Sequence, residues 1–71
     1  MRINIDAIEL EIEKRNWSMA KFARKAQLSR SYVSRVLARE RAGGLDFLEG
    51  VMIAFPDIDF RDILILEKSR F

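Results

Sequence analysis

The chain of 71 residues contains no cysteine and no histidine, and it has only one proline and three glycines. Without cysteine there is neither a disulfide framework nor a thiolate metal site, and without histidine the commonest metal ligand and general base is missing. No apolar run approaches the roughly 18 residues needed to cross a membrane, and the N-terminus lacks the apolar segment of a signal peptide. We therefore expect a cytoplasmic protein that has no metal or cofactor and is not an enzyme.

Apolar residues make up 49% of the chain and charged residues 34%, which is a globular rather than a disordered composition. A chain of this length forms one domain, residues 1–71, with a modest core. We expect its stability to be marginal or to be raised by a partner.

The charge is unevenly distributed along the chain. Residues 1–13 and 42–71 each carry a net charge of −3, whereas residues 14–41 hold nine Lys or Arg and one acid, Glu40, for a net charge of +8. A basic segment between two acidic flanks is typical of a protein that binds a polyanion. The alternative is that these charges only form a solvated helix face.

Capping residues and apolar spacing predict five short helices. The helices are expected over residues 6–15, 19–26, 30–38, 45–55 and 60–66. The predicted N-caps are Asp6, Ser18, Ser29 and Asp59. Pro56 ends the fourth helix, and Asn16 suits the left-handed conformation that closes the first. Although Ile8–Glu13 alternates as a strand would, its good helix formers favour an all-α fold.

Met19–Leu37 contains the most informative pattern. Two helices joined by three residues, Gln27–Ser29, must cross steeply, which requires a small residue at the crossing and apolar residues around it. Ala23 is the small residue, and the apolar residues are Phe22, Leu28, Val33 and Val36. This spacing predicts a helix-turn-helix. Its outward positions hold only types that can read base edges, namely Arg30, Ser31, Ser34 and Arg35.

Residues 14–66 resemble the DNA-binding domain of the lambdoid phage repressor and Cro family of helix-turn-helix regulators. The run K-R-N-W-S-M-A-K-F-A-R-K-A-Q-L-S-R-S-Y-V-S-R-V-L is similar to the end of that family's first helix, its second helix, the turn and the recognition helix. The run L-D-F-L-E-G-V-M-I-A-F-P-D-I-D-F-R-D-I-L is similar to its last two helices. Gln27 departs from the pattern, because the family's turn usually begins with Gly, and a positive φ costs a non-glycine residue about 1 kcal/mol.

The resemblance implies a compact five-helix bundle that binds double-stranded DNA sequence-specifically. It would act in the nucleoid as a small phage-type or bacterial transcriptional repressor, by occluding its operator as a homodimer. The residues implied to contact bases are Ser29, Arg30, Ser31, Ser34 and Arg35. The residues implied to contact phosphates are Ser18, Met19, Lys21, Tyr32, Arg39 and Arg41.

Several of these residues also have a simpler interpretation. Arg30 and Arg35 can be ordinary solvated charges. Lys21, Arg24 and Lys25 are expected to form a general electrostatic background rather than specific contacts. Tyr32 can instead cover the junction between the second and third helices. Trp17 is expected to be a core anchor rather than a stacking platform.

Four consecutive large apolar residues occur near the end of the chain, namely Ile63, Leu64, Ile65 and Leu66. A one-turn helix cannot bury all four in so small a core, so we expect a homodimer contact there, with the β-prone Met1–Ile5 adding an arm. The alternative places Ile63 and Leu66 in the core and leaves the other two exposed.

Two other functions are also compatible with the sequence. One is a protein-interaction module, such as an antitoxin or antirepressor, which the apolar residues near the end of the chain favour. The other is an RNA-binding domain, which the basic middle permits but which lacks the exposed aromatic platform expected for single strands.

Overall fold

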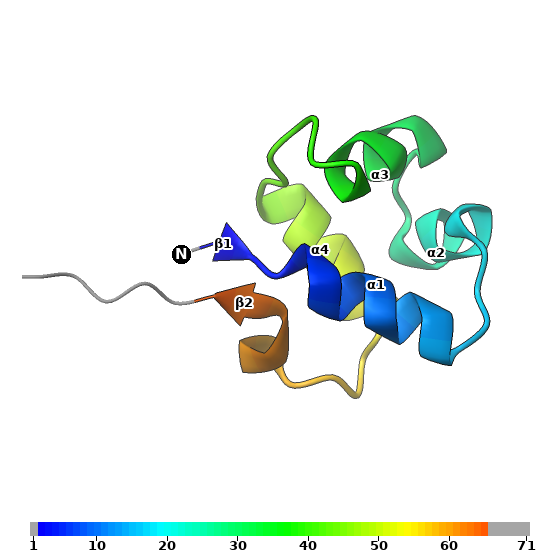
Figure 1. Ribbon diagram of the computed structural model, residues 1–71. Helices are drawn as coiled ribbons and strands as arrows, with labels where there is room; N and C mark the ends of the chain where they lie inside the picture. The colour runs from blue at the N-terminus through cyan, green and yellow to red at the C-terminus, as the bar shows by residue number, and fades with distance from the viewer. Residues whose placement is uncertain (1, 66–71) are drawn as a thin grey trace, which may run out of the picture.

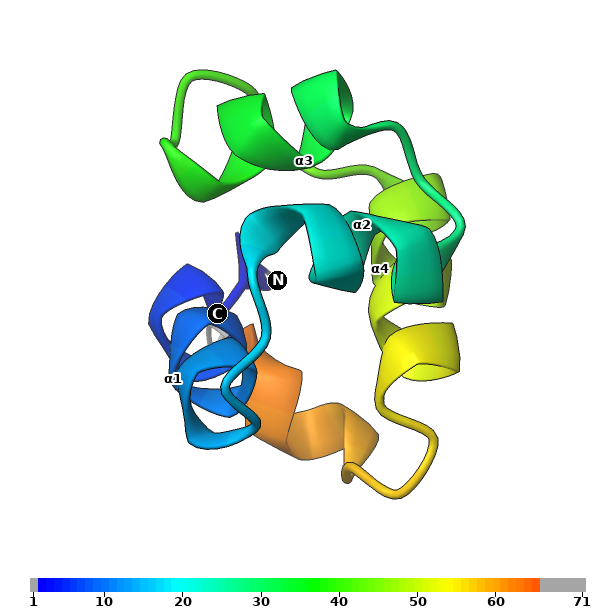
Figure 2. The same cartoon turned by 90° about the vertical axis from the view of Figure 1, so that its right-hand side faces the viewer.

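A computed structural model describes residues 2–65 of the chain. This part contains four α-helices, one short 3₁₀ helix and a two-stranded antiparallel ribbon. The α-helices are α1 (Ile5–Lys14), α2 (Met19–Ala26), α3 (Arg30–Leu37) and α4 (Leu45–Ala54). The 3₁₀ helix is Phe60–Ile63, and the strands are β1 (Arg2–Ile3) and β2 (Leu64–Ile65). Figure 1 shows the ribbon at one end of the molecule and α2 with α3 at the other, and Figure 2 views the molecule from the α2 side.

The mostly helical class is confirmed, but the prediction of a fifth α-helix over 60–66 is wrong, and a two-stranded ribbon is added to the helices. Asp59 does cap a helix, because its side chain accepts a hydrogen bond from the Arg61 N–H at 2.9 Å, but the helix is a single 3₁₀ turn. The chain then extends into β2, which pairs with β1 in the register Arg2–Ile65 and Ile3–Leu64. This pairing satisfies backbone groups that a four-residue helix leaves open.

The N-caps of α2 and α3 are confirmed. The hydroxyls of Ser18 and Ser29 accept hydrogen bonds from the N–H groups three residues further on, each at 3.1 Å. The predicted cap of the first helix is wrong, because Asn4 takes that role by accepting from the Ala7 N–H at 3.1 Å. Asp6 instead lies in the first turn, where a negative charge favours the helix dipole.

Helices α1, α2 and α3 end in the same way, with one residue at positive φ after each. These residues are Asn16 (56°), Gln27 (59°) and Arg39 (62°). After α2, the Leu28 N–H donates to the Ala23 carbonyl at 2.9 Å, which is the bond of a Schellman motif. Gln27 therefore adopts the glycine-type conformation that its position in the turn requires. Arg39 also adopts this conformation, which no local sequence pattern predicts.

The core lies where α2 packs on α4. The Phe22 ring stacks on Phe55 at a centroid distance of 5.5 Å and meets Phe47 edge-on at 6.5 Å. Trp17 also stacks on Phe55, at a centroid distance of 5.3 Å, which confirms it as an anchor of the core. The contact between α2 and α4 is the most extensive one between helices in the described residues.

The ribbon brings the two ends of the described chain together. Ile63 is fully buried, Leu64 is nearly so and Ile65 is half-buried. Leu66, the last residue of the predicted dimer contact, lies outside the described residues. The β-prone start of the chain thus pairs with the apolar segment within one molecule. No helix within residues 2–65 has the length and apolar character to span a membrane.

Candidate nucleic-acid interface

Helix α3 has one buried and one polar face. Its buried residues are Val33, Val36 and Leu37. Its exposed residues are the four predicted to face outward, namely Arg30, Ser31, Ser34 and Arg35. Because an α-helix turns once in 3.6 residues, the apolar spacing that fixes α3 on the core also turns these four side chains to solvent.

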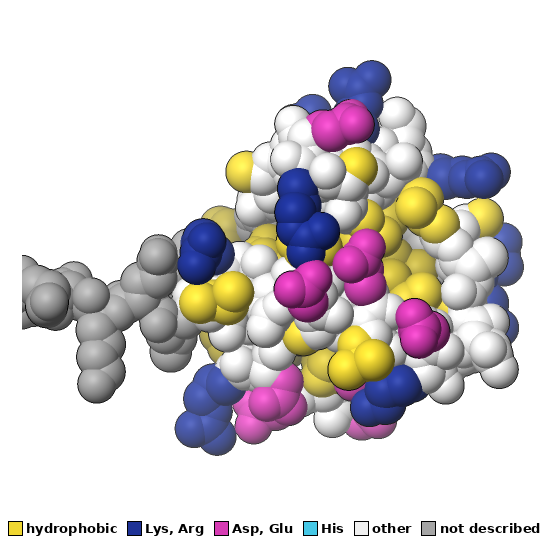
Figure 3. Space-filling model, viewed as in Figure 1, with side chains coloured by type: hydrophobic (Ala, Val, Ile, Leu, Met, Phe, Trp, Pro, Cys, Tyr) yellow, Lys and Arg dark blue, Asp and Glu magenta, His cyan; other side chains and the backbone are white. Residues whose placement is uncertain are grey.

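Helices α2 and α3 together form a surface that we call the basic face. Its members are exposed and positively charged, and they are Lys21, Arg24, Lys25, Arg30 and Arg35. Neither helix contains an acidic residue, and none of the five forms an ion pair with another residue in the range 2–65. Figure 3 shows Lys and Arg side chains projecting along the top and right-hand edge, where Figure 1 places α3 and α2.

Two members of the basic face were not predicted as contacts. Arg24 and Lys25 lie on α2 beside Lys21 and are also exposed. The Nζ atoms of Lys21 and Lys25 lie 5.8 and 6.0 Å from the Trp17 ring centroid, so both follow the same side of α2. The sequence predicts both as a general electrostatic background, and the absence of any acid between residues 19 and 26 is the signal that indicates a continuous basic surface.

The connection between α2 and α3 is held on the core. Leu28 is half-buried and packs against it, and Gly50 of α4 lies directly beneath the turn. A Cβ atom on Gly50 would lie 2.9 Å from the Ala26 carbonyl oxygen and 2.7 Å from Cδ1 of Leu28. Only a residue without a side chain allows α4 to approach this closely, and α4 thereby supports the turn from which α3 projects.

The start of α2 presents two of the predicted phosphate contacts. Ser18 is exposed and caps the helix, and Met19 is partly exposed beside it. The first N–H groups of any helix have no partner inside it, so an N-terminus can hold an anion such as a phosphate. The Ser29 hydroxyl oxygen accepts a hydrogen bond in the same way at the start of α3 and keeps its proton for donation.

Tyr32 joins α3 to the start of α4. Its hydroxyl donates to the Asp46 carboxylate at 2.8 Å and accepts from the Gly44 N–H at 3.3 Å. Its ring meets Phe47 edge-on at 5.9 Å. The tyrosine therefore covers a helix junction, but the junction is that of α3 with α4. Asp46 had no predicted role, because this contact crosses 14 residues of sequence.

The two remaining predicted phosphate contacts differ in their surroundings. Arg39 forms an ion pair with Asp6 of α1, so its charge is partly neutralised. Arg41 places its guanidinium 5.0 Å from the centroid of the Tyr32 ring and has no ion pair within the described part of the chain. Of the predicted dimer residues, Ile63 and Leu64 are already buried in the core of a single chain.

No cluster of three or more potential metal-ligating side chains is found among residues 2–65. The chain matches no family model, no curated protein and no solved structure. The function proposed below is therefore inferred from the basic face and from the contacts that hold α2 and α3 in place.

Proposed function

We propose that the protein binds double-stranded DNA through the basic face and acts as a helix-turn-helix transcriptional repressor. The observation that carries the proposal is a surface of two adjacent helices with five exposed cations, no acid and no internal ion pair within residues 2–65. Such a surface attracts phosphates of any duplex, because it releases the counterions that surround DNA.

In this proposal α3 is the recognition helix and enters the major groove, which is wide enough for an α-helix. Arg30 and Arg35 read guanine, since a guanidinium can bond both O6 and N7. Ser31 and Ser34 lie between them and supply shorter hydrogen-bonding groups. Ser29 stands at the N-terminal end of the helix, which approaches the base edges first.

Helix α2 lies across the backbone and positions the protein. Lys21 and the N-terminus of α2, with Ser18 and Met19, hold phosphates. Arg41 reaches the backbone from the connection between α3 and α4, whereas Arg39 does so only if it leaves Asp6. Two copies on adjacent half-sites, about 34 Å apart, would cover an operator and exclude polymerase.

The proposal is tested with site selection from a random duplex library, followed by fluorescence anisotropy across a salt series. If about six phosphates are neutralised, log K falls with log salt at a slope of roughly −5. A flat salt dependence would contradict duplex binding and favour the alternative of a protein-interaction module.

Three variants separate reading from positioning. Arg30→Ala and Arg35→Ala are each expected to lose about 1–3 kcal/mol on the selected site and to relax preference at one base pair. Lys21→Ala is expected to weaken all duplexes alike and to reduce the salt slope by about one. Lys14→Ala is the matched control, because Lys14 is exposed but pairs with Glu11 on α1. If both Arg variants lose the same affinity for every duplex sequence, the remaining candidates for base contacts are Ser29, Ser31 and Ser34.

A further inference from the structure

Tyr32 is the only tyrosine of the chain, and its hydroxyl is bonded to two groups at the start of α4. The hydroxyl donates to the Asp46 carboxylate at 2.8 Å and accepts from the Gly44 N–H at 3.3 Å. A tyrosine hydroxyl has a single proton, and the phosphates of DNA offer only acceptor oxygens. While the bond to Asp46 is formed, the hydroxyl therefore has no proton to donate to a phosphate.

The Asp46 carboxylate also makes this position unfavourable for a phosphate. It is an exposed negative charge beside the hydroxyl, and it forms no ion pair within residues 2–65. A phosphate that approached the hydroxyl would meet this like charge. The carboxylate also accepts from the Phe47 N–H at 2.8 Å, which holds it at the first turn of α4. The bond between Tyr32 and Asp46 is thus a contact that the protein makes within itself.

The face of the Tyr32 ring carries a different contact. The guanidinium of Arg41 lies 5.0 Å from the ring centroid, close enough for its positive charge to be attracted by the π electrons. The ring is held from two sides, because it meets Phe47 edge-on at 5.9 Å and its hydroxyl is bonded to Asp46. The tyrosine therefore presents a fixed surface to the long side chain of Arg41.

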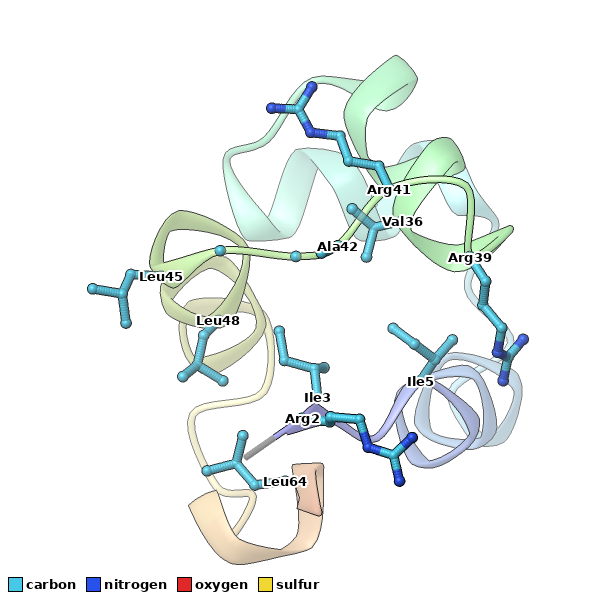
Figure 4. A pocket seen from close by; sticks show the side chains of 12 residues that line it. Arg2, Ile3, Ile5, Val36, Arg39, Arg41, Ala42, Leu45, Leu48 and Leu64 are labelled. Atoms are coloured by element: carbon cyan, nitrogen blue, oxygen red, sulfur yellow. The ribbon is translucent and has the colours of Figure 1, made fainter. Parts of the chain in front are cut away.

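The two arginines in the connection between α3 and α4 point in different directions. Arg39 pairs with Asp6 of α1, whereas Arg41 is exposed and has no ion pair in the described part of the chain. Figure 4 shows Arg39 pointing toward α1 and Arg41 pointing away from the hollow between the ribbon and α4. Arg41 is therefore the cation of this connection that is available to a phosphate, and the Tyr32 ring limits where its guanidinium lies.

We propose that Tyr32 is a positioning residue that acts on DNA through Arg41 and does not contact a phosphate itself. This inference rests on the proposed function. Because α3 carries the ring, Arg41 is held beside the recognition helix while that helix lies in the groove. A side chain that is already ordered loses less conformational entropy on binding, so the ring raises the affinity for duplex DNA. Since phosphates carry no sequence information, this gain is the same for every duplex.

Four variants separate the ring from the hydroxyl, and both from the arginine. Tyr32→Phe removes only the hydroxyl, whereas Tyr32→Leu removes the hydroxyl and the ring but keeps an apolar side chain against Phe47. Arg41→Ala removes the cation, and a double variant combines it with Tyr32→Leu. Fluorescence anisotropy with the selected duplex and with a random duplex, across a salt series, measures the affinity of each variant. Thermal unfolding checks that each variant is folded at the temperature of the assay.

The expected losses follow from the role of each group. Arg41→Ala is expected to lose about tenfold in affinity and to reduce the salt slope by about one. Tyr32→Leu is expected to lose about twofold to fivefold on both duplexes and to make the salt dependence less steep, because Arg41 is then unsupported. Tyr32→Phe keeps the ring and is expected to restore the affinity to within about twofold of the parent protein, with the parent's salt slope. In the Arg41→Ala background, Tyr32→Leu is expected to cause no further loss.

Lys21→Ala is the matched control for the double variant, because Lys21 lies on α2 with its Nζ atom 5.8 Å from the Trp17 ring centroid. The losses of Tyr32→Leu and Lys21→Ala are expected to multiply. An equal loss in Tyr32→Phe and Tyr32→Leu would assign the effect to the hydroxyl. An undiminished Tyr32→Leu loss in the Arg41→Ala background would show that the ring acts independently of Arg41. Either result, or a Tyr32→Leu protein that binds as the parent does, would overturn the proposal.

A measurement without DNA separates this inference from the proposed function. The ring current of Tyr32 is expected to shift NMR signals of the Arg41 side chain upfield in the free protein. The shift is expected to persist in Tyr32→Phe and to vanish in Tyr32→Leu, and its absence from the parent would refute the contact itself. If the shift is present but no duplex is bound, the DNA-binding function is refuted, and the role of Tyr32 in it is refuted too. If duplex is bound but the variants give the contrary results above, only the positioning role is refuted.

Discussion

Replacing Gly50 by alanine tests how α4 supports the connection between α2 and α3. The added methyl would lie 2.9 Å from the Ala26 carbonyl oxygen and within 3.0 Å of two carbon atoms of Leu28. The Leu28 side chain can rotate away, but the carbonyl belongs to the last turn of α2 and moves only with the backbone. Helix α4 must therefore shift away from the turn.

Two opposing effects set the size of the change. Alanine is about 1 kcal/mol better than glycine in the interior of a helix. Overpacking of a close contact costs about 1–3 kcal/mol, and a backbone atom among the clashing partners places this case in the upper part of that range. We expect Gly50→Ala to lower the free energy of unfolding by about 1–2 kcal/mol, which lowers the melting temperature by roughly 5–15 °C in a domain of this size.

Thermal unfolding followed by circular dichroism measures the change, with Glu49→Ala as an exposed control on the same helix. The double variant with Leu28→Ala separates the two clashes, because it removes the leucine and leaves the carbonyl. If the carbonyl dominates, the double variant shows no relief. A Gly50→Ala protein as stable as the parent, with unchanged duplex affinity, would refute the close approach of α4 to the turn.

Three further predictions concern the other local features of the fold. Gln27→Gly removes the cost of a left-handed glutamine and is expected to stabilise the protein by about 1 kcal/mol in a urea titration. Ala23→Leu overpacks a nearly fully buried position on α2 and is expected to cost about 1–3 kcal/mol, so an unchanged melting temperature would contradict the packing of α2. The hydrogen bond from the Arg61 N–H, followed by the Arg61 side chain, lowers the pKa of Asp59. The Asp59 cap therefore stabilises the folded protein fully above the ordinary carboxyl pKa. This stabilisation is lost as the pH falls through the lower pKa of the folded state. NMR titration of the Asp59 carboxyl group measures that pKa.

Local features of the fold could be predicted because they depend on neighbouring residues. The caps at Ser18 and Ser29 and the left-handed residues at Asn16 and Gln27 each follow from residue types within one helical turn. The polar face of α3 follows from the spacing of its buried valines and leucine. These local features are sufficient to predict which residues form the candidate site.

The tail could not be predicted because its structure depends on a distant partner. The sequence predicts that Ile63–Leu66 is helical and that its excess of apolar side chains is covered by a second molecule. The structure pairs Leu64 with Ile3 from the other end of the described chain, and this ribbon buries Ile63 and Leu64 within one molecule. The apolar side chains of a β-prone segment can be assigned to the core of a single molecule only when its partner strand is known.

The net charge of the candidate site depends on ion pairs between neighbouring residues and on ion pairs between residues far apart in the sequence. Of the nine cations between residues 14 and 41, Lys14 and Arg15 pair with Glu11, a contact that helical spacing predicts. Arg39 pairs with Asp6 across 33 residues, and no local pattern indicates this contact. The cations without an ion pair in the described residues are then Lys21, Arg24, Lys25, Arg30, Arg35 and Arg41. If the positive charges of these six residues, including Arg30 and Arg35 in the groove, together offset about six phosphate charges, the salt slope of roughly −5 follows from the folded structure rather than from the total charge of the segment.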